Sequence, residues 1–524
     1  MLSMSEWSSA ICSPAAVVDI GSNSIRLVVF RDRSRAAPVV FNERVTCGIG
    51  RDLATTGKLH TEGVQKALAN LPRFAAIVAA MNIDETTLLA TAASREASDG
   101  ADFLKRVERI FGCRVTQLDG DQEAQLAANG VISGLPAARG LAADLGGGSL
   151  ELAAVSDGRV GDHGSLPLGP LRLVAMGLVN SKLARHIDEQ LDQFSWIDGA
   201  AANRTIYVVG GAWRALARLH MEQTEYPLRV IHSYQMNGQD ALDFCGVVAK
   251  LSAASLSRIS VVPRSRVLTL PTAALVLARL IDVAGARSLV FSANGIREGS
   301  QYEALDADTR AADPLIVACE HFAARENRAL GSGAALFAWV SPLFEGEDAE
   351  SCRLRRAACL LADIGWHEHP DYRAEQVYFR ILRLPLMGLT HEEKAKIALA
   401  VYRRYTGAKG GNTLRVANML LAPDDIEWSS RLGASLRLAE TLTGGNPALL
   451  QGASLNLDER RLSMTLEPGR ADLFGDLVRI RFAALAKLFG VSGVITGDGL
   501  SEELGSGPLT GPEATQPRPR PPRV

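Results

Sequence analysis

Residues 143–151 read Ala-Asp-Leu-Gly-Gly-Gly-Ser-Leu-Glu, and residues 17–24 read Val-Val-Asp-Ile-Gly-Ser-Asn-Ser. In each stretch an apolar run ends at an aspartate, Asp144 or Asp19, and passes into small residues, a pattern typical of a buried strand that feeds a turn. Glycine lets backbone N–H groups approach an anion closely, and serine or asparagine adds a short donor. Since an aspartate at a strand end can hold a divalent cation or a water molecule, two such loops predict a clamp around a phosphate and its metal ion.

The pattern occurs twice along the chain. Apolar segments flank each loop and predict one hairpin over residues 17–30 and another over residues 141–155. Two later strands also end in glycine, one before Gly210-Gly211 and one over Ser288–Gly295. This repetition predicts an internal duplication with two lobes, and ligands commonly bind in the cleft between such lobes.

At 524 residues the chain exceeds the size of one core, because single cores stop growing near about 250–300 residues. Strand-rich patterns give way to helical ones near residue 306. We therefore predict a disordered leader, a first lobe, a second lobe, a mainly helical region with a small strand pair, and a disordered tail rich in Pro and Arg. Their boundaries are 1–13, 14–135, 136–306, 307–503 and 504–524.

Charge and cysteine usage narrow the class of protein. The formal net charge of −2 excludes recognition of a polyanion by overall charge, so a local basic lining is required. The seven cysteines are scattered without CxxC spacing, which suits a reducing cytoplasm. The N-terminus lacks a secretory pattern and no apolar run is long enough to span a membrane. We expect a cytoplasmic protein that binds neither membranes nor nucleic acid.

Six segments carry a resemblance to a known family. They occur in this order: 19–24, 55–59, 91–97, 121–124, 144–151 and 292–299. Together they resemble the exopolyphosphatase / guanosine pentaphosphate phosphatase family, which belongs to the sugar kinase, heat-shock ATPase and actin class. The resemblance implies an α/β two-lobed actin-like (ribonuclease H-like) core, followed by a mainly helical, degenerate HD-like region.

The resemblance also implies site residues. Glu123 matches the catalytic glutamate that positions and deprotonates water, although a glutamate in a first helical turn is often only solvated. Asp144 and Glu151, with Asp19 as a third, are candidate ligands of Mg²⁺ or Mn²⁺; Glu151 alternatively acts as a second base or is only an edge-strand residue. The expected phosphate-binding residues are Ser22, Asn23, Ser24, Arg95, Gly146, Gly147, Gly148, Ser149, Gly210, Gly211 and, more weakly, Arg266.

Some positions depart from the family pattern. Leu150 stands where the family more often has threonine, and Ala212 stands where a small hydroxyl residue is common, so no donor is expected at 212. In the helical region, Ala362-Asp363 is similar to the His-Asp dyad of metal-dependent phosphohydrolases, but alanine replaces the histidine. We therefore expect this region to help dimerise the protein and to shape a channel for a long anionic chain, not to form a second metal site.

Four functions remain open on the sequence. The first is an exopolyphosphatase that releases orthophosphate from inorganic polyphosphate, with a link to the stringent response. The second is a guanosine pentaphosphate 5′-phosphohydrolase that uses the same loops. The third is an actin-like ATP-binding kinase, and the fourth is a non-catalytic phosphate-ligand sensor. Glu123 with Arg95 fits water activation better than phosphoryl transfer to a sugar, and we expect a homodimeric hydrolase.

Overall fold

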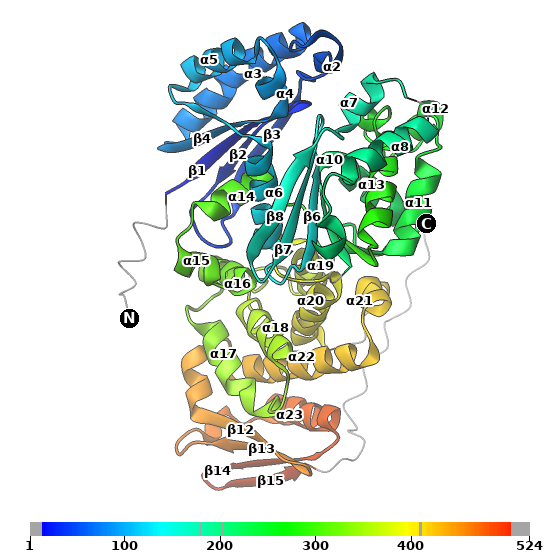
Figure 1. Cartoon of the computed structure of the whole chain (residues 1–524). Coiled ribbons are helices and arrows are strands. Elements are labelled where there is room, and N and C mark those ends of the chain that lie inside the picture. The colour runs from blue at the N-terminus through cyan, green and yellow to red at the C-terminus, as the bar shows by residue number, and fades with distance from the viewer. Residues whose placement is uncertain (1–12, 179, 201–203, 408–410, 505–524) are drawn as a thin grey trace, which may run out of the picture. The chain divides into compact units, whose positions relative to one another are not determined.

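The computed structural model describes residues 13–178, 180–200, 204–407 and 411–504. The predicted leader and tail lie outside these ranges except at their inner ends. The chain divides into two compact units, residues 1–319 with 383–394 and residues 320–382 with 395–524. Figure 1 shows the elements of both. Among the described helices, none is both long and apolar enough to cross a membrane.

The first unit opens with a five-stranded mixed sheet in the order β3-β2-β1-β4-β5. Its strands are β1 (Ala15–Ile20), β2 (Ser24–Phe30), β3 (Val39–Thr46), β4 (Glu85–Ala90) and β5 (Val115–Gln117). The helices of this part are α2 (Leu53–Thr56), α3 (Thr61–Ala80), α4 (Ala92–Glu96) and α5 (Gly100–Phe111). Val18 and Ile20 pack in one core with residues of α3 and α5, whereas Val17 belongs to a cluster on the other face. Burial on both faces explains why β1 is apolar almost throughout.

A second mixed sheet follows, in the order β10-β11-β9-β6-β7-β8. Its strands are β6 (Gly140–Leu145), β7 (Leu150–Ser156), β8 (Arg159–Leu166), β9 (Thr205–Val209), β10 (Tyr234–Asn237) and β11 (Ser288–Phe291). The helices of this part are α7 (Pro170–Ala175), α8 (Asn180–Leu191), α9 (Ile197–Ala200), α10 (Gly211–Gln223), α11 (Gly238–Val248), α12 (Ala253–Ser257) and α13 (Leu270–Ala284). The two edge strands of this sheet, β8 and β10, are not among the predicted strands.

The two sheets repeat one topology. In each, an antiparallel hairpin holds a Gly/Ser loop, a third strand extends the hairpin, and the first strand pairs in parallel with the fourth: β1 with β4, and β6 with β9. The register matches as well: Ile20 pairs with Ile25 beside the first loop, and Leu145 pairs with Leu150 beside the second. The predicted duplication is therefore present in the strand order and in the position of each loop.

Helix α6 (Gly120–Gly134) packs against both sheets. Leu126 joins the cluster on the first sheet, and Val131 joins a cluster with β6, β7 and β9. The helix also crosses α14 (Ile296–Glu303) at a pair of glycines, where a Cβ added at Gly299 would lie 1.8 Å from the Leu126 carbonyl oxygen. Because only glycine allows this approach, the N-terminus of α6 is held at the junction of the two lobes.

The second unit is mainly helical and carries a four-stranded sheet in the order β12-β13-β14-β15. The remaining helices of the chain, some of which begin in the first unit, are α15 (Ala307–Ala311), α16 (Pro314–Glu326), α17 (Ser332–Val340), α18 (Ala349–Leu360), α19 (Arg373–Arg383), α20 (His391–Thr406), α21 (Arg415–Leu420), α22 (Pro423–Thr443) and α23 (Asp476–Phe489). The strands are β12 (Ala453–Leu457), β13 (Arg461–Leu466), β14 (Ser492–Gly497) and β15 (Leu500–Leu504). The predicted strand pair is present as β12 and β13, but the sheet is larger, because β14 joins β13 in parallel after the α23 crossover and β15 pairs with β14.

Candidate active site between two glycine loops

The two Gly/Ser loops have the same backbone turn. The Gly21 N–H donates to the Ser24 carbonyl at 3.0 Å, and the Gly146 N–H donates to the Ser149 carbonyl at 3.0 Å. The loops also lie against each other: a Cβ added at Gly147 would be 3.3 Å from the Ser22 Cβ. Since both loops come from strand ends of different sheets, this contact closes one edge of a shared site.

A cavity of about 140 Å³ lies between the loops. Most of the predicted site residues line it: Asp19, Ser22, Asn23, Ser24, Glu123, Asp144, Gly146, Gly147, Ser149, Glu151, Gly210, Gly211 and Arg266. Gly148 and Arg95 do not line it. The Gly148 carbonyl accepts a hydrogen bond from Arg172 Nε at 3.1 Å, and Arg95 binds a carboxylate of the site.

That carboxylate belongs to Glu123, in the first turn of α6 and only 3% exposed. Arg95 Nη1 donates to Glu123 Oε1 at 2.6 Å and also to the Leu118 carbonyl. Burial raises the pKa of Glu123 to about 7, although Arg95 acts to lower it. A carboxylate with a pKa near neutrality, held in one orientation by an arginine, suits the acceptance of a proton from water.

Asp144 and Glu151 face each other across the β6–β7 hairpin. Burial raises the pKa of Asp144 to about 6, although Arg214 and Arg297 lower it. Burial, with Glu123 and Asp144 nearby, raises the pKa of Glu151 well above its usual value. Glu151 Oε1 also accepts a hydrogen bond from Ser165 Oγ at 3.0 Å. These carboxylates are costly to ionise together, so a cation beside them would be stabilising.

Few carboxylates of the site are available to bind a divalent cation. Asp19 is already paired, since Arg297 Nη1 donates to its Oδ2 at 2.7 Å. Within the part of the chain that the structure describes, no three His, Cys, Asp or Glu side chains converge to hold a metal ion. Mg²⁺ commonly uses one or two carboxylates and completes its shell with waters and phosphate oxygens. Asp144 and Glu151 fit that arrangement, and Mg²⁺ or Mn²⁺ stays a prediction.

Four arginines of the site were assigned no role from the sequence. Arg26, Arg44, Arg214 and Arg297 line the same cavity as Arg266. Register places Arg26 of β2 directly between Asp19 and Arg44 on the neighbouring strands. Burial lowers the pKa of both Arg26 and Arg266 to about 10, so each still carries its charge at neutral pH. For Arg26 the sequence carries a signal, a charged residue inside an otherwise apolar strand, which indicates a ligand-facing position. Arg44 lies on a strand with other polar residues, and Arg214 and Arg297 lie on helices, so the same signal is absent for them.

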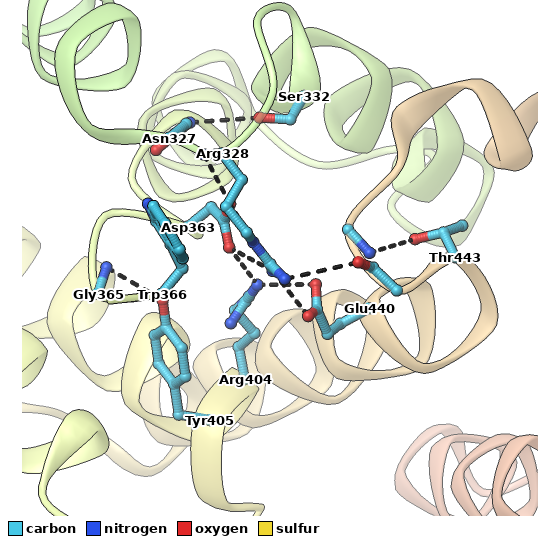
Figure 2. A network of polar contacts seen from close by, with 12 residues as sticks. Asn327, Arg328, Ser332, Asp363, Gly365, Trp366, Arg404, Tyr405, Glu440 and Thr443 are labelled. Carbon is cyan, nitrogen blue, oxygen red and sulfur yellow. Dashed lines mark hydrogen bonds and ion pairs between the residues drawn. The ribbon is translucent and has the colours of Figure 1, made fainter. Parts of the chain in front are cut away.

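Asp363 lies in a different environment, an ion-pair network of the second unit (Figure 2). The Arg328 guanidinium donates to both of its carboxylate oxygens, through Nη2 at 2.8 Å and Nε at 3.1 Å, and Arg404 Nη2 donates at 2.9 Å. Glu440 accepts from both arginines and completes the network. Two histidines follow Asp363 closely in the sequence, His367 and His369, and both are exposed. Asp363 is thus engaged by guanidinium groups, and the HD-like origin of this region stays a prediction.

Asp363→Ala is expected to lower the free energy of unfolding by about 3 kcal/mol, because it leaves two arginines partly buried without their carboxylate. Activity per folded molecule should be unchanged. Chemical denaturation measures the first effect, and Asp371→Ala, at an exposed carboxylate nearby, is the control with a change within about 0.5 kcal/mol. Loss of activity in a well-folded Asp363→Ala protein would instead indicate a working second site.

Comparison with known families gives two matches that together cover most of the chain. Residues 28–308 match the Ppx/GppA phosphatase family. Residues 315–495 match the family described as exopolyphosphatase, C-terminal. The first match begins within β2, so it covers the second sheet with its Gly/Ser loop and most of the first sheet, whereas β1 and the first Gly/Ser loop precede it. The second match covers most of the mainly helical part.

The individual relatives share only low sequence identity with this chain. The chain is 26% identical to retrograde regulation protein 2 of Saccharomyces cerevisiae over 442 residues, which is 75% of this chain and 72% of that protein. It is 30% identical to exopolyphosphatase 1 of Mycobacterium tuberculosis over 196 residues, which is 37% of this chain and 56% of the relative. The relatives therefore include a regulator as well as an enzyme.

Two solved structures share the fold of the first part. A crystal structure of an exopolyphosphatase-like protein matches with a TM-score of 0.50 and 26% identity, over 55% of this chain and 96% of that one. An exopolyphosphatase from Cytophaga hutchinsonii matches with a TM-score of 0.50 and 20% identity, over 55% and 97%. The predicted actin-like α/β fold with mixed sheets is confirmed, and a helical region follows it.

Proposed function

Because the chain belongs to the Ppx/GppA phosphatase family, we propose that it is an exopolyphosphatase that hydrolyses the terminal phosphoanhydride bond of inorganic polyphosphate. The observation that carries this proposal is the position of Glu123. Its buried carboxylate shares one cavity with two Gly/Ser loops and five arginines. Hydrolysis of a phosphoanhydride needs these parts: donors around the phosphoryl group, positive charge, and a group that directs water.

In the proposed reaction the two loops hold the terminal phosphate through backbone N–H groups and the hydroxyls of Ser22 and Ser149. Glu123 orients a water molecule and accepts its proton, while Arg95 fixes the carboxylate as a positioning residue. The water oxygen forms a bond to phosphorus and the bridging P–O bond breaks, so the shortened chain leaves. Mg²⁺ or Mn²⁺, held by Asp144 and Glu151, would offset the charge of the phosphate oxygens.

The lining of the cavity favours a polymer over a nucleotide. Five arginines face four carboxylates there, which suits a ligand of high negative charge that arrives with a cation. A guanine base needs an apolar or aromatic surface to stack on. Among the described residues that line the cavity, none is aromatic, and the branched apolar ones are Leu145, Val209 and Ile296. Guanosine pentaphosphate is therefore the second candidate substrate.

A regulatory role is the alternative from another class, because the yeast relative is named a retrograde regulation protein. A sensor needs the phosphate loops but not a buried glutamate beside them, so Glu123 supports the enzyme. The homodimeric state and the cytoplasmic location stay predictions of the sequence analysis.

The test compares orthophosphate release from long polyphosphate and from guanosine pentaphosphate, with Mg²⁺ and with a chelator. We expect release from polyphosphate in Mg²⁺, at least about 10-fold faster than from the nucleotide and lost with the chelator. Faster release from the nucleotide would favour the second candidate. Binding of polyphosphate without release from either compound would favour the sensor and contradict the proposal.

A further inference from the structure

A second cavity, of about 340 Å³, lies within the second unit. Three aromatic side chains line it, from the segment before α18, from α22 and from the end of α23: Phe344, Trp428 and Phe489. Phe344 is central, with ring centroids 6.3 Å from Trp428 and 6.2 Å from Phe489 in edge-to-face contact. We call this cavity the aromatic groove.

The rings of the aromatic groove already accept cations of the protein itself. Lys396 Nζ lies 4.5 Å from the centre of the Trp428 ring, and the Arg431 guanidinium lies 4.9 Å from the centre of the Phe489 ring. Such contacts are attractive because the face of an aromatic ring is negative. The groove therefore combines an apolar lining with a preference for positive charge.

Carboxylates add to this preference. Four acidic side chains and one arginine line the groove. Glu427 is paired with Arg431, and Glu347 with Arg355. Glu345 and Asp424 are exposed, and neither forms an ion pair with any residue that the structure describes. A ligand with an apolar body and several cationic groups would complete this surface.

We propose that the aromatic groove binds the chain's own segment Pro517–Val524. This segment reads Pro-Arg-Pro-Arg-Pro-Pro-Arg-Val, with arginines at 518, 520 and 523 and no acidic residue. Proline-rich peptides bind aromatic-lined grooves through their proline rings. The arginines would give Glu345 and Asp424 the positively charged partners that they lack. The segment and the groove are therefore complementary in composition and in charge.

The last described residue, Leu504, lies close enough to the aromatic groove for the segment Pro517–Val524 to reach it. Leu504 pairs with Gly493, which follows the groove residue Phe489 by four positions. At about 3.8 Å per residue and about 5 Å across a strand pair, Leu504 lies within about 20 Å of Phe489. Twelve residues, 505–516, precede the segment. Since a coil of that length has a root-mean-square span of about 19 Å, the linker matches the distance to be bridged.

The test measures binding of a fluorescent peptide with the sequence of residues 516–524 to the full chain by anisotropy. A short tether gives an effective concentration of about 1 mM. If the tail binds with a Kd of about 0.1 mM, molecules with the tail in the groove outnumber those with an open groove by about tenfold. Replacing Arg518, Arg520 and Arg523 of the chain by alanine should open the groove, and peptide binding should become about 10-fold tighter than in the wild type.

Charge reversal at the groove supplies the specificity control. In the triple-alanine background, Asp424→Lys should weaken peptide binding at least about 10-fold, whereas Glu459→Lys, at an exposed acid in the β12–β13 turn, should not. Equal peptide binding by wild type and triple variant, or equal loss from both lysine variants, would overturn the proposal. Concentration-dependent self-association of the wild type that the triple variant lacks would assign the tail to a second copy and overturn it likewise.

Discussion

Glu123→Gln is expected to lower the rate of phosphate release from polyphosphate by about 10²–10⁴-fold, the range that a positioned general base contributes. The amide keeps the shape of the side chain and an oxygen that can accept from Arg95, but it cannot take a proton from water. Polymer binding should remain, because the loops and the five arginines are unchanged. Single-turnover phosphate release together with an equilibrium binding assay separates the two effects.

Asp121→Asn is the matched control for this prediction. Asp121 lies in the same first helical turn of α6 but is exposed to solvent. The Asp121→Asn variant should retain the wild-type rate of phosphate release. Wild-type turnover by Glu123→Gln would show that another group directs the water, and loss of polymer binding would show that Glu123 acts in substrate binding instead.

The local sequence was sufficient to place the two loops. An apolar strand that ends in Asp and passes into Gly and Ser specifies both the strand and its turn, and the structure gives both loops the same 3.0 Å backbone hydrogen bond. The duplication follows from the same local pattern. That the loops meet depends on α6, which packs on both sheets through apolar residues that no local pattern could have paired.

The arginines of the site were harder to predict. Arg26 and Arg44 lie on different strands, and only the register between β2 and β3 brings them side by side. Arg95 was expected to face phosphate, and it donates to Glu123 because the start of α6 lies against α4. In each case the role depends on pairing between distant segments, which a single sequence does not encode in its spacing.

The C-terminal strands illustrate the same limit. The hairpin β12–β13 has a tight turn at Asp458, whose carboxylate accepts backbone N–H bonds from residues 460 and 461, and the sequence predicts it. β14 is short, contains two glycines and pairs in parallel with β13 only after the α23 crossover. A strand of this kind is stabilised by its neighbours more than by its own residues.

Asp144→Asn is expected to raise the Mg²⁺ concentration for half-maximal activity by about 10–100-fold, the range seen when the support of a metal site is weakened. The substitution removes one of the two carboxylates proposed to hold the cation and keeps the shape of the side chain. Titration of phosphate release with Mg²⁺ and then with Mn²⁺ measures the effect. Asp162→Asn, at an exposed carboxylate on β8, should leave the titration unchanged.

Thermal unfolding of Asp144→Asn separates loss of metal binding from loss of structure. Burial raises the pKa of Asp144 to about 6, so the folded state holds this proton more tightly than the unfolded chain does. The metal-free wild type should therefore lose stability as pH rises from about 4 to about 7, and the asparagine variant should lose less. At pH 7.5 without metal the variant should be at least as stable as the wild type, whereas the rise in Tm that Mg²⁺ gives the wild type should shrink in it. A variant that unfolds early without metal, or that keeps the full Mg²⁺-induced rise, would show that Asp144 supports the fold and not the cation.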